Sequence, residues 1–309
     1  MTDTKGGWDN TCCPAFFNRK ETTMTAIIID GKSSAAKLRA EITEKVAILK
    51  KQGVVPGIVS IIVGDDPASK TYLKNKQKVA QQMGFHADLL ELEETISQQM
   101  LMDIIEGFNH NPRIHGIVVQ MPLPKHMNTK EVMLSIKHEK DIDGFHPHNL
   151  GMLVHRDEHI IPSTPRGVMR LLQDYNVDLK GKKVVVVGQS TIVGRPLALL
   201  ALDQQATVTV CTSNTPDLKK ETLQADVLFS AAGKIGLITA EHVKEGAVVI
   251  DVGVNYDENG RMCGDVCFEE VSQKASMITP VPGGIGPMTV ASIFEQTYLN
   301  TVDIIAKKS

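Results

Sequence analysis

The chain has 309 residues, of which 42% are hydrophobic and 22% are charged, and its formal net charge is -3. This length suits two domains that each bury their own interior better than one large core. The ordinary composition and small net charge do not favour a nucleic acid or a membrane surface as partner, and no apolar run approaches the roughly 20 residues that span a bilayer. We therefore expect a two-domain protein that acts on small molecules.

The five cysteines, at positions 12, 13, 211, 263 and 267, are odd in number and form no Cys-x-x-Cys pair. This pattern favours a reducing compartment over a zinc ribbon, so we expect a cytoplasmic protein. Residues 1–23 suit neither a secretory signal, because the apolar stretch 12–17 is too short, nor a mitochondrial transit peptide, because Asp3 and Asp9 are acidic. We expect a disordered extension there and a folded region that begins near Met24.

The first half of the chain alternates between strand and helix patterns. Residues 57–63 form a nearly continuous apolar run, which is typical of a strand buried on both faces. Strands are also predicted at 26–29, 88–92 and 117–119, and helices at 38–49, around Tyr72 and Lys76, at 97–108 and at 129–136. This alternation predicts an α/β domain with a mostly parallel sheet.

The run Ser69–Lys76 spaces a tyrosine and a lysine four residues apart within one of these helices. That spacing puts Tyr72 and Lys76 on one helix face, where both side chains can meet a single ligand. Ser69 is the expected N-cap, because it follows a turn-forming Gly-Asp-Asp-Pro run. Taken alone, the same pattern is also common on solvated helices.

From Phe145 to Ser163 the sequence is rich in histidine and proline and shows no clear periodicity, so we place the passage between domains there. Beyond it, strand patterns at 184–187, 207–211, 227–230 and 248–252 alternate with helical segments, as in a Rossmann-like unit. We predict a first domain at 24–160, a dinucleotide-binding domain at 161–289, and a last helix at 290–306 that packs back on the first domain.

The segment Gly188–Pro196 follows a predicted strand and opens a helix. In this context free amides at a helix N-terminus can bind a pyrophosphate. The segment departs from the usual Gly-x-Gly-x-x-Gly fingerprint, because Ser190 occupies the second glycine position and Gly194 follows Gly188 by six residues. A plain strand-to-helix turn is the alternative interpretation.

Five segments in this chain order together resemble the bifunctional methylenetetrahydrofolate dehydrogenase/methenyltetrahydrofolate cyclohydrolase family, over roughly residues 24 to 300. They are Ser69–Lys76, Val118–Pro124, Lys140–Phe145, Gly188–Pro196 and Pro280–Thr289. The resemblance implies oxidation of 5,10-methylenetetrahydrofolate by hydride transfer to NADP, and then hydrolysis of the methenyl product to 10-formyltetrahydrofolate. Tetrahydrofolate derivatives are thus the expected ligands, and the family also implies a homodimer.

The resemblance also assigns roles to single residues. Tyr72 would pack on the folate, Lys76 would assist water attack and proton movement, Gln120 would orient Lys76, and Asp143 would bind the pterin edge. Gly283 and Gly284 would let the backbone approach the ligand, although a turn that requires positive φ explains both glycines equally well.

For the cofactor, the resemblance indicates the loop and the end of the next strand, with Gly188, Gln189, Ser190, Gly194, Arg195, Thr212 and Ser213 as the binding residues. Relatives that use NADP commonly carry Arg where Gln189 stands, and His-Ser-Arg or His-Ser-Lys where this chain has Thr212, Ser213 and Asn214. No carboxylate at the strand end repels a 2′-phosphate. We therefore expect NADP to be preferred, by a reduced margin, with NAD also possible.

Two other functions remain open at this point: a dehydrogenase without cyclohydrolase activity, and a non-catalytic nucleotide-sensing or scaffold protein that keeps the Rossmann module. A metal is not expected, because the spacing of His146, His148, His155 and His159 matches no metal-binding helix.

Overall fold

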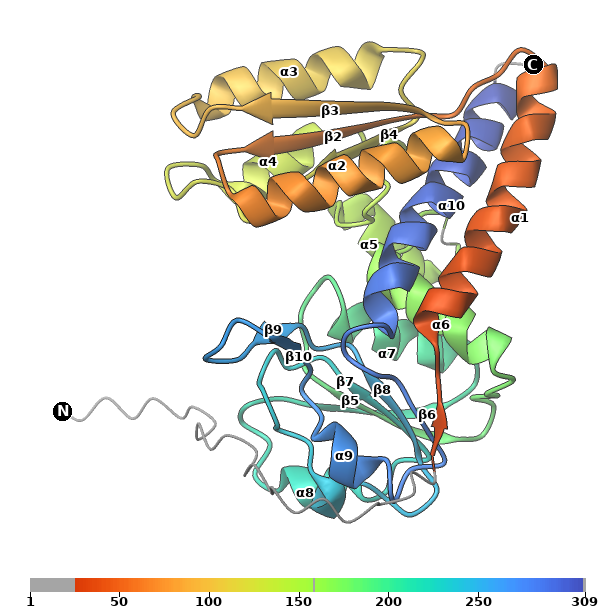
Figure 1. The fold of residues 1–309 in the computed structure, drawn as a ribbon, viewed down its shortest axis with the longest axis vertical. Helices are drawn as coiled ribbons and strands as arrows, with labels where there is room; N and C mark the ends of the chain where they lie inside the picture. Colours follow the sequence, from red (N-terminus) through yellow and green to blue (C-terminus); the bar gives the residue numbers. More distant parts are fainter. Residues whose placement is uncertain (1–25, 158, 308–309) are drawn as a thin grey trace. The chain divides into compact units, whose positions relative to one another are not determined.

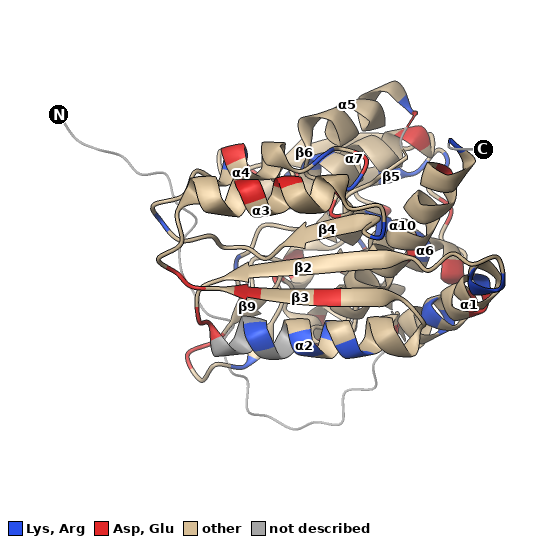
Figure 2. Cartoon of the chain, turned by 90° about the horizontal axis from the view of Figure 1, so that it is seen from above, with Lys and Arg blue, Asp and Glu red and all other residues tan. Residues whose placement is uncertain are grey.

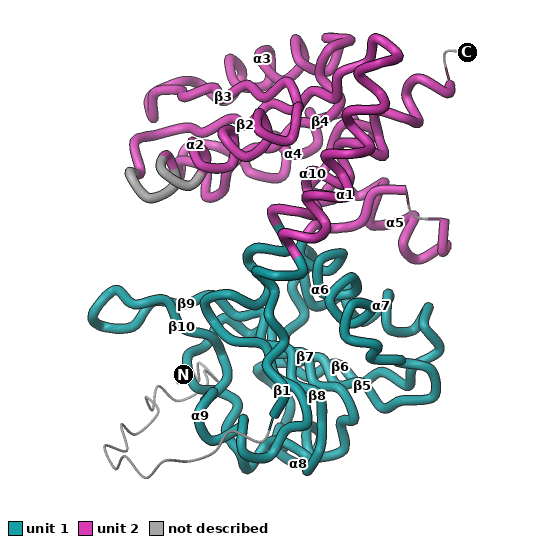
Figure 3. Tube along the Cα trace, turned by 45° about the vertical axis from the view of Figure 1, so that its right-hand side comes forward, with its two compact units in different colours: residues 1–34, 164–289 teal, residues 35–163, 290–309 magenta. Residues whose placement is uncertain are grey.

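The computed structural model describes residues 26–157 and 159–307 of the chain, so the expectation for residues 1–23 lies outside the described part. The chain divides into two compact units (Figure 3). Unit 1 contains the residues up to 34 together with 164–289, and unit 2 contains 35–163 together with the residues from 290 onward. Each unit is described by itself.

Unit 1 is built on a six-stranded sheet in the order β1-β11-β8-β7-β5-β6, in which every pairing is parallel. Its strands are β1 (Ile27–Ile28), β5 (Lys183–Val187), β6 (Thr207–Cys211), β7 (Val227–Ser230), β8 (Val248–Asp251) and β11 (Met277–Ile278). Its other elements are α6 (Ser163–Asp174), α7 (Gly194–Asp203), α8 (Leu218–Thr222), η1 (Ala240–His242), the hairpin of β9 (Asn255–Tyr256) and β10 (Met262–Cys263), and α9 (Phe268–Val271).

The side chains of strand β5 show that this sheet is covered on both faces. Its four valines, Val184–Val187, are all buried, which requires cover on both faces of the sheet. The helix α7 packs against β5 and β6 and buries Leu197 and Ala201, while Val185 and Val187 join the main core cluster of the unit. The four strands that sequence periodicity predicted between residues 184 and 252 are therefore confirmed.

The first strand pairs differently from the expectation. The alternation pattern groups residues 26–29 with the first domain, but β1 pairs with β11, with Ile27 opposite Met277 and Ile28 opposite Ile278. It thus completes one edge of the unit 1 sheet. An apolar tetrapeptide carries no information about which sheet it joins, because pairing partners are decided by tertiary packing.

Unit 2 contains a three-stranded parallel sheet in the order β3-β2-β4 (Figure 1). The strands are β2 (Gly57–Val63), β3 (His86–Leu92) and β4 (Gly116–Val119). The helices are α1 (Gly31–Lys51), α2 (Pro67–Gln82), α3 (Gln98–His110), α4 (Thr129–Ser135), α5 (Pro147–His155) and α10 (Ile285–Ala306), with α1 and α10 assigned to this unit from residues 35 and 290 onward.

The middle strand β2 is buried at all of its positions, as the continuous apolar run predicted. The helices α3 and α4 cover the face of the sheet that carries Val59, Ile61 and Val63, and they form one apolar cluster with it. The helix α2 packs against β2 and β3. The predicted α/β class with a mostly parallel sheet is confirmed for this unit.

Three boundaries differ from the sequence predictions. The helix α2 begins at Pro67, so Ser69 lies within it and is not its N-cap. The stretch without clear periodicity contains α5, which His146 caps through its ring nitrogen and which has proline at its start. The helix α10 begins at Ile285 rather than at residue 290. Two of these misses concern where a helix starts, and the third is a whole helix that the pattern did not reveal.

Basic positions on α2 lie beside acidic positions on the edge strand β3 (Figure 2). The Nζ atoms of Lys70 and Lys74 lie 3.1 and 3.2 Å from the carboxylate of Glu91 on β3. These half-exposed pairs contribute little to stability, but they show that Lys74 faces β3. Among the described helices, none has both the length and the apolarity required to cross a membrane.

Candidate active site

The most unusual electrostatic feature of unit 2 is a buried lysine close to a carboxylate. Lys76, on α2, is 4% exposed, and burial lowers the pKa of its amine while the charge of Asp143 acts in the opposite direction. Burial also raises the pKa of the Asp143 carboxyl, and Lys76 opposes that shift. Each group therefore stabilises the charged form of the other, while burial disfavours both charges.

The position of Asp143 is fixed by a segment that runs alongside β4. Ile117 of β4 donates its N–H to the carbonyl of Lys140 at 2.8 Å and forms a parallel bridge with Asp141. The chain then turns at Gly144, whose φ of 75° and contact with Pro162 leave no room for a side chain. Asp143 thus lies at the end of a strand-like extension of the sheet.

A glutamine of α10 holds the same segment from the other side. The Gln296 amide donates to the carbonyl of Ile142 at 2.7 Å and accepts from the N–H of Ile161 at 2.8 Å. Gln296 is buried, and the Ile142 carbonyl accepts a second hydrogen bond from the Ser163 hydroxyl at 3.1 Å, so the polar groups of this segment are satisfied in the interior. This side chain therefore restrains the backbone on either side of the Asp143 turn.

Two other predicted residues lie on neighbouring elements. Gln120 follows β4, where its N–H donates to the carbonyl of Ile61 at 2.8 Å and its side-chain amide donates to the carbonyl of Met121 at 2.8 Å. Tyr72 lies in α2, one turn before Lys76, and its side chain lies outside the described part of the structure. The backbone of α2 nevertheless gives Tyr72 and Lys76 the predicted four-residue spacing.

Sequence analysis missed the other aspartate of this segment. The Oδ2 atom of Asp141 accepts hydrogen bonds from the N–H of His146 at 2.7 Å and from the Asn149 amide at 3.0 Å. Its Oδ1 atom is buried and accepts none from the described residues. Burial raises the pKa of Asp141 to about 6, and the charge of Asp143 adds to the effect. Its position two residues before Asp143 was the available signal.

Gly283 and Gly284 belong to unit 1, where backbone geometry accounts for both. Gly283 has φ of 112°, and a Cβ on Gly284 would lie 2.6 Å from the carbonyl oxygen of Pro280. A Cβ on Gly31 would in turn overlap the carbonyl of Gly284. The turn therefore requires these glycines whether or not a ligand approaches them, and their role in substrate binding stays a prediction.

The predicted cofactor loop joins β5 to α7 in unit 1. Gly188 has φ of 114°, and its Cα approaches the carbonyl of Ala231 so closely that a Cβ would overlap it. A Cβ on Gly194 would likewise overlap the carbonyl of Gly188. The Ser190 hydroxyl oxygen accepts from the N–H groups of Val193 and Gly194 at 3.2 and 3.3 Å, which leaves its own proton free for a ligand.

The remaining cofactor candidates flank this loop. Gln189 and Ser213 are exposed, and Thr212 accepts from the N–H of Asn214 at 3.2 Å within a turn after β6. Arg195 is also exposed, and its Nε donates to the carbonyl of Gln189 at 3.1 Å. A glycine cradle at a helix N-terminus with hydroxyl donors beside it fits a dinucleotide phosphate.

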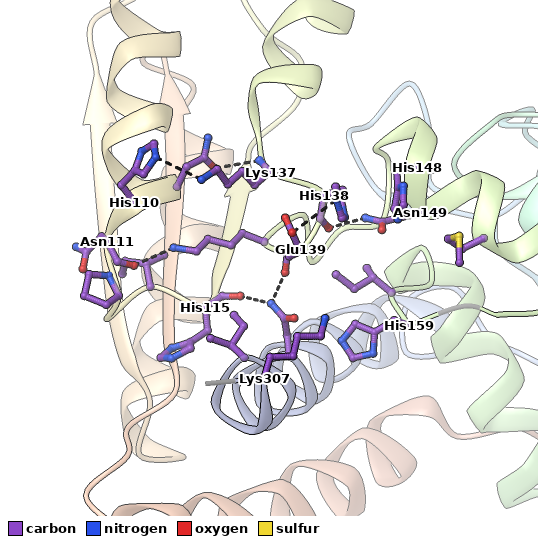
Figure 4. A pocket seen from close by; sticks show the side chains of 18 of the residues that line it. His110, Asn111, His115, Lys137, His138, Glu139, His148, Asn149, His159 and Lys307 are labelled. Atoms are coloured by element: carbon purple, nitrogen blue, oxygen red, sulfur yellow. Dashed lines mark hydrogen bonds and ion pairs between the residues drawn. The ribbon is translucent and has the colours of Figure 1, made fainter. Parts of the chain in front are cut away.

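Unit 2 also contains a cavity of about 420 Å³, seen from close by in Figure 4. Its lining is rich in histidine and lysine, including His110, His138, His148, His159, Lys137 and Lys307. Asn149 lines this cavity and donates to both His138 and Asp141. Within the described ranges, no group of three or more His, Cys, Asp or Glu residues could hold a metal ion.

A parallel sheet with a glycine loop before its helix defines unit 1 as a dinucleotide-binding unit, and a buried amine beside a carboxylate makes unit 2 a candidate acid–base centre. The fold and the site therefore define a nucleotide-dependent α/β enzyme. Family profiles narrow this class. The profile of the tetrahydrofolate dehydrogenase/cyclohydrolase catalytic domain matches residues 29–143, and that of the corresponding NAD(P)-binding domain matches residues 162–304.

Individual relatives agree with the profiles. The bifunctional protein FolD of Streptococcus thermophilus is 52% identical over 274 residues, which cover 88% of this chain and 96% of that protein. The crystal structure of the bifunctional enzyme FolD from Campylobacter jejuni has a TM-score of 0.88 at 46% identity, and covers 90% of this chain and 99% of that one. The FolD structure from Trypanosoma brucei, complexed with NADP cofactor and inhibitor, has a TM-score of 0.86 at 39% identity, and covers 91% and 98%. The chain belongs to the tetrahydrofolate dehydrogenase/cyclohydrolase family.

The buried Asp141 generates a prediction about pH. Because its pKa is about 6 in the folded chain, the folded protein retains a proton that the unfolded chain releases from about pH 4 upward, so this residue lowers stability as pH rises through that interval. Asp141→Asn should therefore gain stability relative to the parent from pH 4.5 to pH 7.5 by about 2 kcal/mol, the part of the full shift that falls in this interval. Urea unfolding at both pH values measures the difference.

Asp157→Asn provides the matched control, because Asp157 is exposed and lies in the same region of unit 2. This control should change stability by less than about 0.5 kcal/mol at either pH. If Asp141→Asn changed stability equally at both pH values, the buried carboxylate would not be the titrating group.

Proposed function

We propose that this chain oxidises 5,10-methylenetetrahydrofolate to 5,10-methenyltetrahydrofolate with NADP and hydrolyses the product to 10-formyltetrahydrofolate. Membership of the family and the bifunctional name of a relative at 52% identity support both activities. The observation that carries the hydrolytic step is the buried amine of Lys76 beside Asp143. A dehydrogenase without cyclohydrolase activity would not need such a group.

Lys76 acts as the proton-transfer group. Water attacks the methenyl carbon, and a neutral amine takes the proton that the water loses as the new C–O bond forms. The resulting ammonium then returns a proton to the ring nitrogen as the C–N bond breaks, and the remaining hydroxyl proton is lost to solvent as the C=O bond forms, which yields the formyl product. Burial makes the neutral amine accessible nearer to neutral pH, because it disfavours the ammonium.

Asp143 and Gln120 prepare the site for this step. The carboxylate of Asp143 can accept two parallel hydrogen bonds from an aminopyrimidine, which orients the pterin. The Gln120 amide nitrogen donates to the carbonyl of Met121. The side-chain oxygen of Gln120 is therefore the atom that can accept a hydrogen bond from the Lys76 ammonium. Tyr72 contributes an aromatic ring for packing on the folate, and Gly283 and Gly284 allow close approach of the backbone.

The cofactor binds to unit 1. The hydroxyls of Ser190, Thr212 and Ser213 are donors for phosphate oxygens, while the N–H groups of Val193 and Gly194 are held by the Ser190 hydroxyl oxygen. Gly188 and Gly194 keep the loop free of side chains where the ligand lies against it. When bound, NADP accepts the hydride from the methylene carbon. A cofactor-bound FolD structure at 39% identity supports NADP as the cofactor.

Lys76→Met tests the hydrolytic assignment. The variant should hydrolyse methenyltetrahydrofolate about 10²–10⁴-fold more slowly, because a positioned acid–base group is lost, while folate binding changes much less. The purified parent and variant are supplied with methylenetetrahydrofolate and either NADP or NAD, and the methenyl and formyl products are followed by absorbance.

Lys78→Met is the matched control, because Lys78 is exposed on the same helix and should leave both activities unchanged. Hydrolysis by Lys76→Met at the parental rate would refute the role of Lys76. A parent that forms neither product would refute the function itself.

Cofactor preference depends on the exposed Gln189. A neutral amide holds a 2′-phosphate less strongly than a guanidinium does, so the parent should prefer NADP by a modest margin. Gln189→Arg should raise the ratio of kcat/KM for NADP to that for NAD by roughly tenfold, the lower end of the range for charge-assisted hydrogen bonds.

Gln189→Met is the control for this measurement, because it keeps the length of the side chain without adding a charge, and it should not raise the ratio. A parent that prefers NAD, or an unchanged ratio in Gln189→Arg, would contradict the assignment of this loop to the phosphate.

We further propose that the protein is a symmetric dimer that pairs through unit 1. The strand β6 forms one edge of the sheet, and Val210 on it is 40% exposed. A partly exposed strand at a sheet edge can pair with a second copy of the chain. Light scattering should therefore return twice the chain mass of 33.7 kDa.

Val210→Lys should shift the protein to the monomer mass at the same concentration. Met262→Lys places the same charge on an exposed position of the β9–β10 hairpin, and it should leave the dimer intact. A monomer mass for the parent chain would contradict the proposal.

A further inference from the structure

Unit 1 has a second loop beside the cofactor loop. In the strand order β8-β7-β5-β6, the chain leaves β5 toward β6 on one side and returns to β7 on the other, so the strand order reverses between β5 and β7. Dinucleotides bind at this kind of reversal, outside the carboxyl ends of the strands. The loops that flank it are 188–193 after β5 and 231–234 after β7, and they touch where Gly188 meets the carbonyl of Ala231.

A single buried carboxylate holds the second loop. Asp265 is 0% exposed, and its Oδ2 atom accepts from the N–H of Ala232 at 2.7 Å and from the N–H of Gly233 at 3.2 Å. Its Oδ1 atom accepts from the N–H of Lys234 at 2.8 Å. Three successive backbone amides thus converge on one anion, which is the geometry of a backbone anion nest.

Two side chains also donate hydrogen bonds to this carboxylate. The hydroxyl of Ser230, at the end of β7, donates to Oδ2 at 3.1 Å, and the amide of Asn255, in β9, donates to Oδ1 at 3.0 Å. Hydrogen bonds to Asp265 therefore connect the end of β7, the loop after it and the β9–β10 hairpin. Hydrogen bonds to an ionised group are about twice as strong as neutral ones, so the restraint on the loop is strong.

Asp251, at the end of β8, fixes the backbone that carries Asp265. Its carboxylate accepts from the N–H groups of Gly253 and Asp265 at 3.0 Å each, and of Val266 at 2.9 Å. The two carboxylates pack against bare backbone, because a Cβ on Gly253 would overlap Asp265 and a Cβ on Gly264 would overlap Asp251. Burial, with the charge of Asp265 beside it, raises the pKa of Asp251 to about 7.

We propose that Asp265 is a positioning residue for the NADP site: its carboxylate fills the anion nest of residues 232–234 and so fixes this loop beside the cofactor loop. The inference rests on the proposed function, because it assigns the cofactor to unit 1. An occupied nest is closed to a phosphate, which leaves the Ser190–Gly194 turn as the place for the pyrophosphate. Asp265 touches neither reactant and acts through the backbone that it holds.

Asp265→Asn in the full chain tests the proposal. An amide keeps the size of the side chain but removes the charge and turns one acceptor into a donor, which faces N–H groups and cannot replace the lost bonds. The dissociation constant of NADP, measured by calorimetry, should rise roughly tenfold to a hundredfold as the loop shifts. Hydrolysis of methenyltetrahydrofolate without added cofactor should continue near the parental rate, because Lys76 and Asp143 lie in unit 2.

Asp257→Asn is the matched control. Asp257 accepts backbone N–H groups of Asn259 and Arg261 within the tip of the same hairpin, and this variant should bind NADP like the parent. If Asp265→Asn fails to fold, the double variant Ser230→Ala with Asn255→Ala removes two donors and keeps the charge, and it should weaken NADP binding in the same direction.

Unchanged NADP affinity in a folded Asp265→Asn, or in the double variant where that is used, would overturn the inference. An equal loss of hydrolysis and NADP binding would also overturn it, because the residue would then support the whole chain rather than the cofactor loop. A parent that binds no NADP would instead refute the proposed function, so the two failures are distinguishable.

Discussion

Burial of parallel strands on both faces is the constraint on which the rest of this structure depends. A strand such as β2 or β5 has no solvent-facing side, so its side chains are mostly apolar and most polar side chains near it lie at or beyond its ends. In unit 2 this places Gln120 and Asp143 at the sheet terminus. In unit 1 it places the glycine loop, Ser230 and Asp251 there. The chemistry of both units is thus concentrated where the strands end.

The polar groups at these ends meet the cost of burial in three different ways. Asp143 is faced by a lysine, Asp265 is surrounded by N–H donors, and Asp141 has one satisfied oxygen and one that accepts no hydrogen bond from the described residues. A buried charge is stable only when it is paired or fully hydrogen-bonded. Asp265 is therefore suited to hold structure in place, whereas the groups with incomplete compensation are suited to exchange protons.

Sequence reasoning succeeded where the signal was local. Apolar runs located β2 and β5, and the order of five short segments indicated the family before any contact was known. It failed where a long-range contact decides the outcome. The partner of β1 and the role of Asp265 both depend on residues far away in the chain, and no periodicity records such pairings. The helix α5 was missed because histidine is not among the usual N-cap residues, although the proline at its first position is a start signal.

In the cofactor loop, the residues that the fold requires are different from the residues proposed to contact the nucleotide. At Gly188 and Gly194 the backbone leaves no room for any side chain, whereas the side chains of Gln189 and Ser213 extend into solvent. Substitution of Gly188 or Gly194 would disrupt the turn, whereas substitution of Gln189 or Ser213 would leave the packing of the unit intact. If the exposed residues contact the nucleotide as proposed, a change of nucleotide preference in evolution would require no spare stability, because these residues are not those that hold the sheet together.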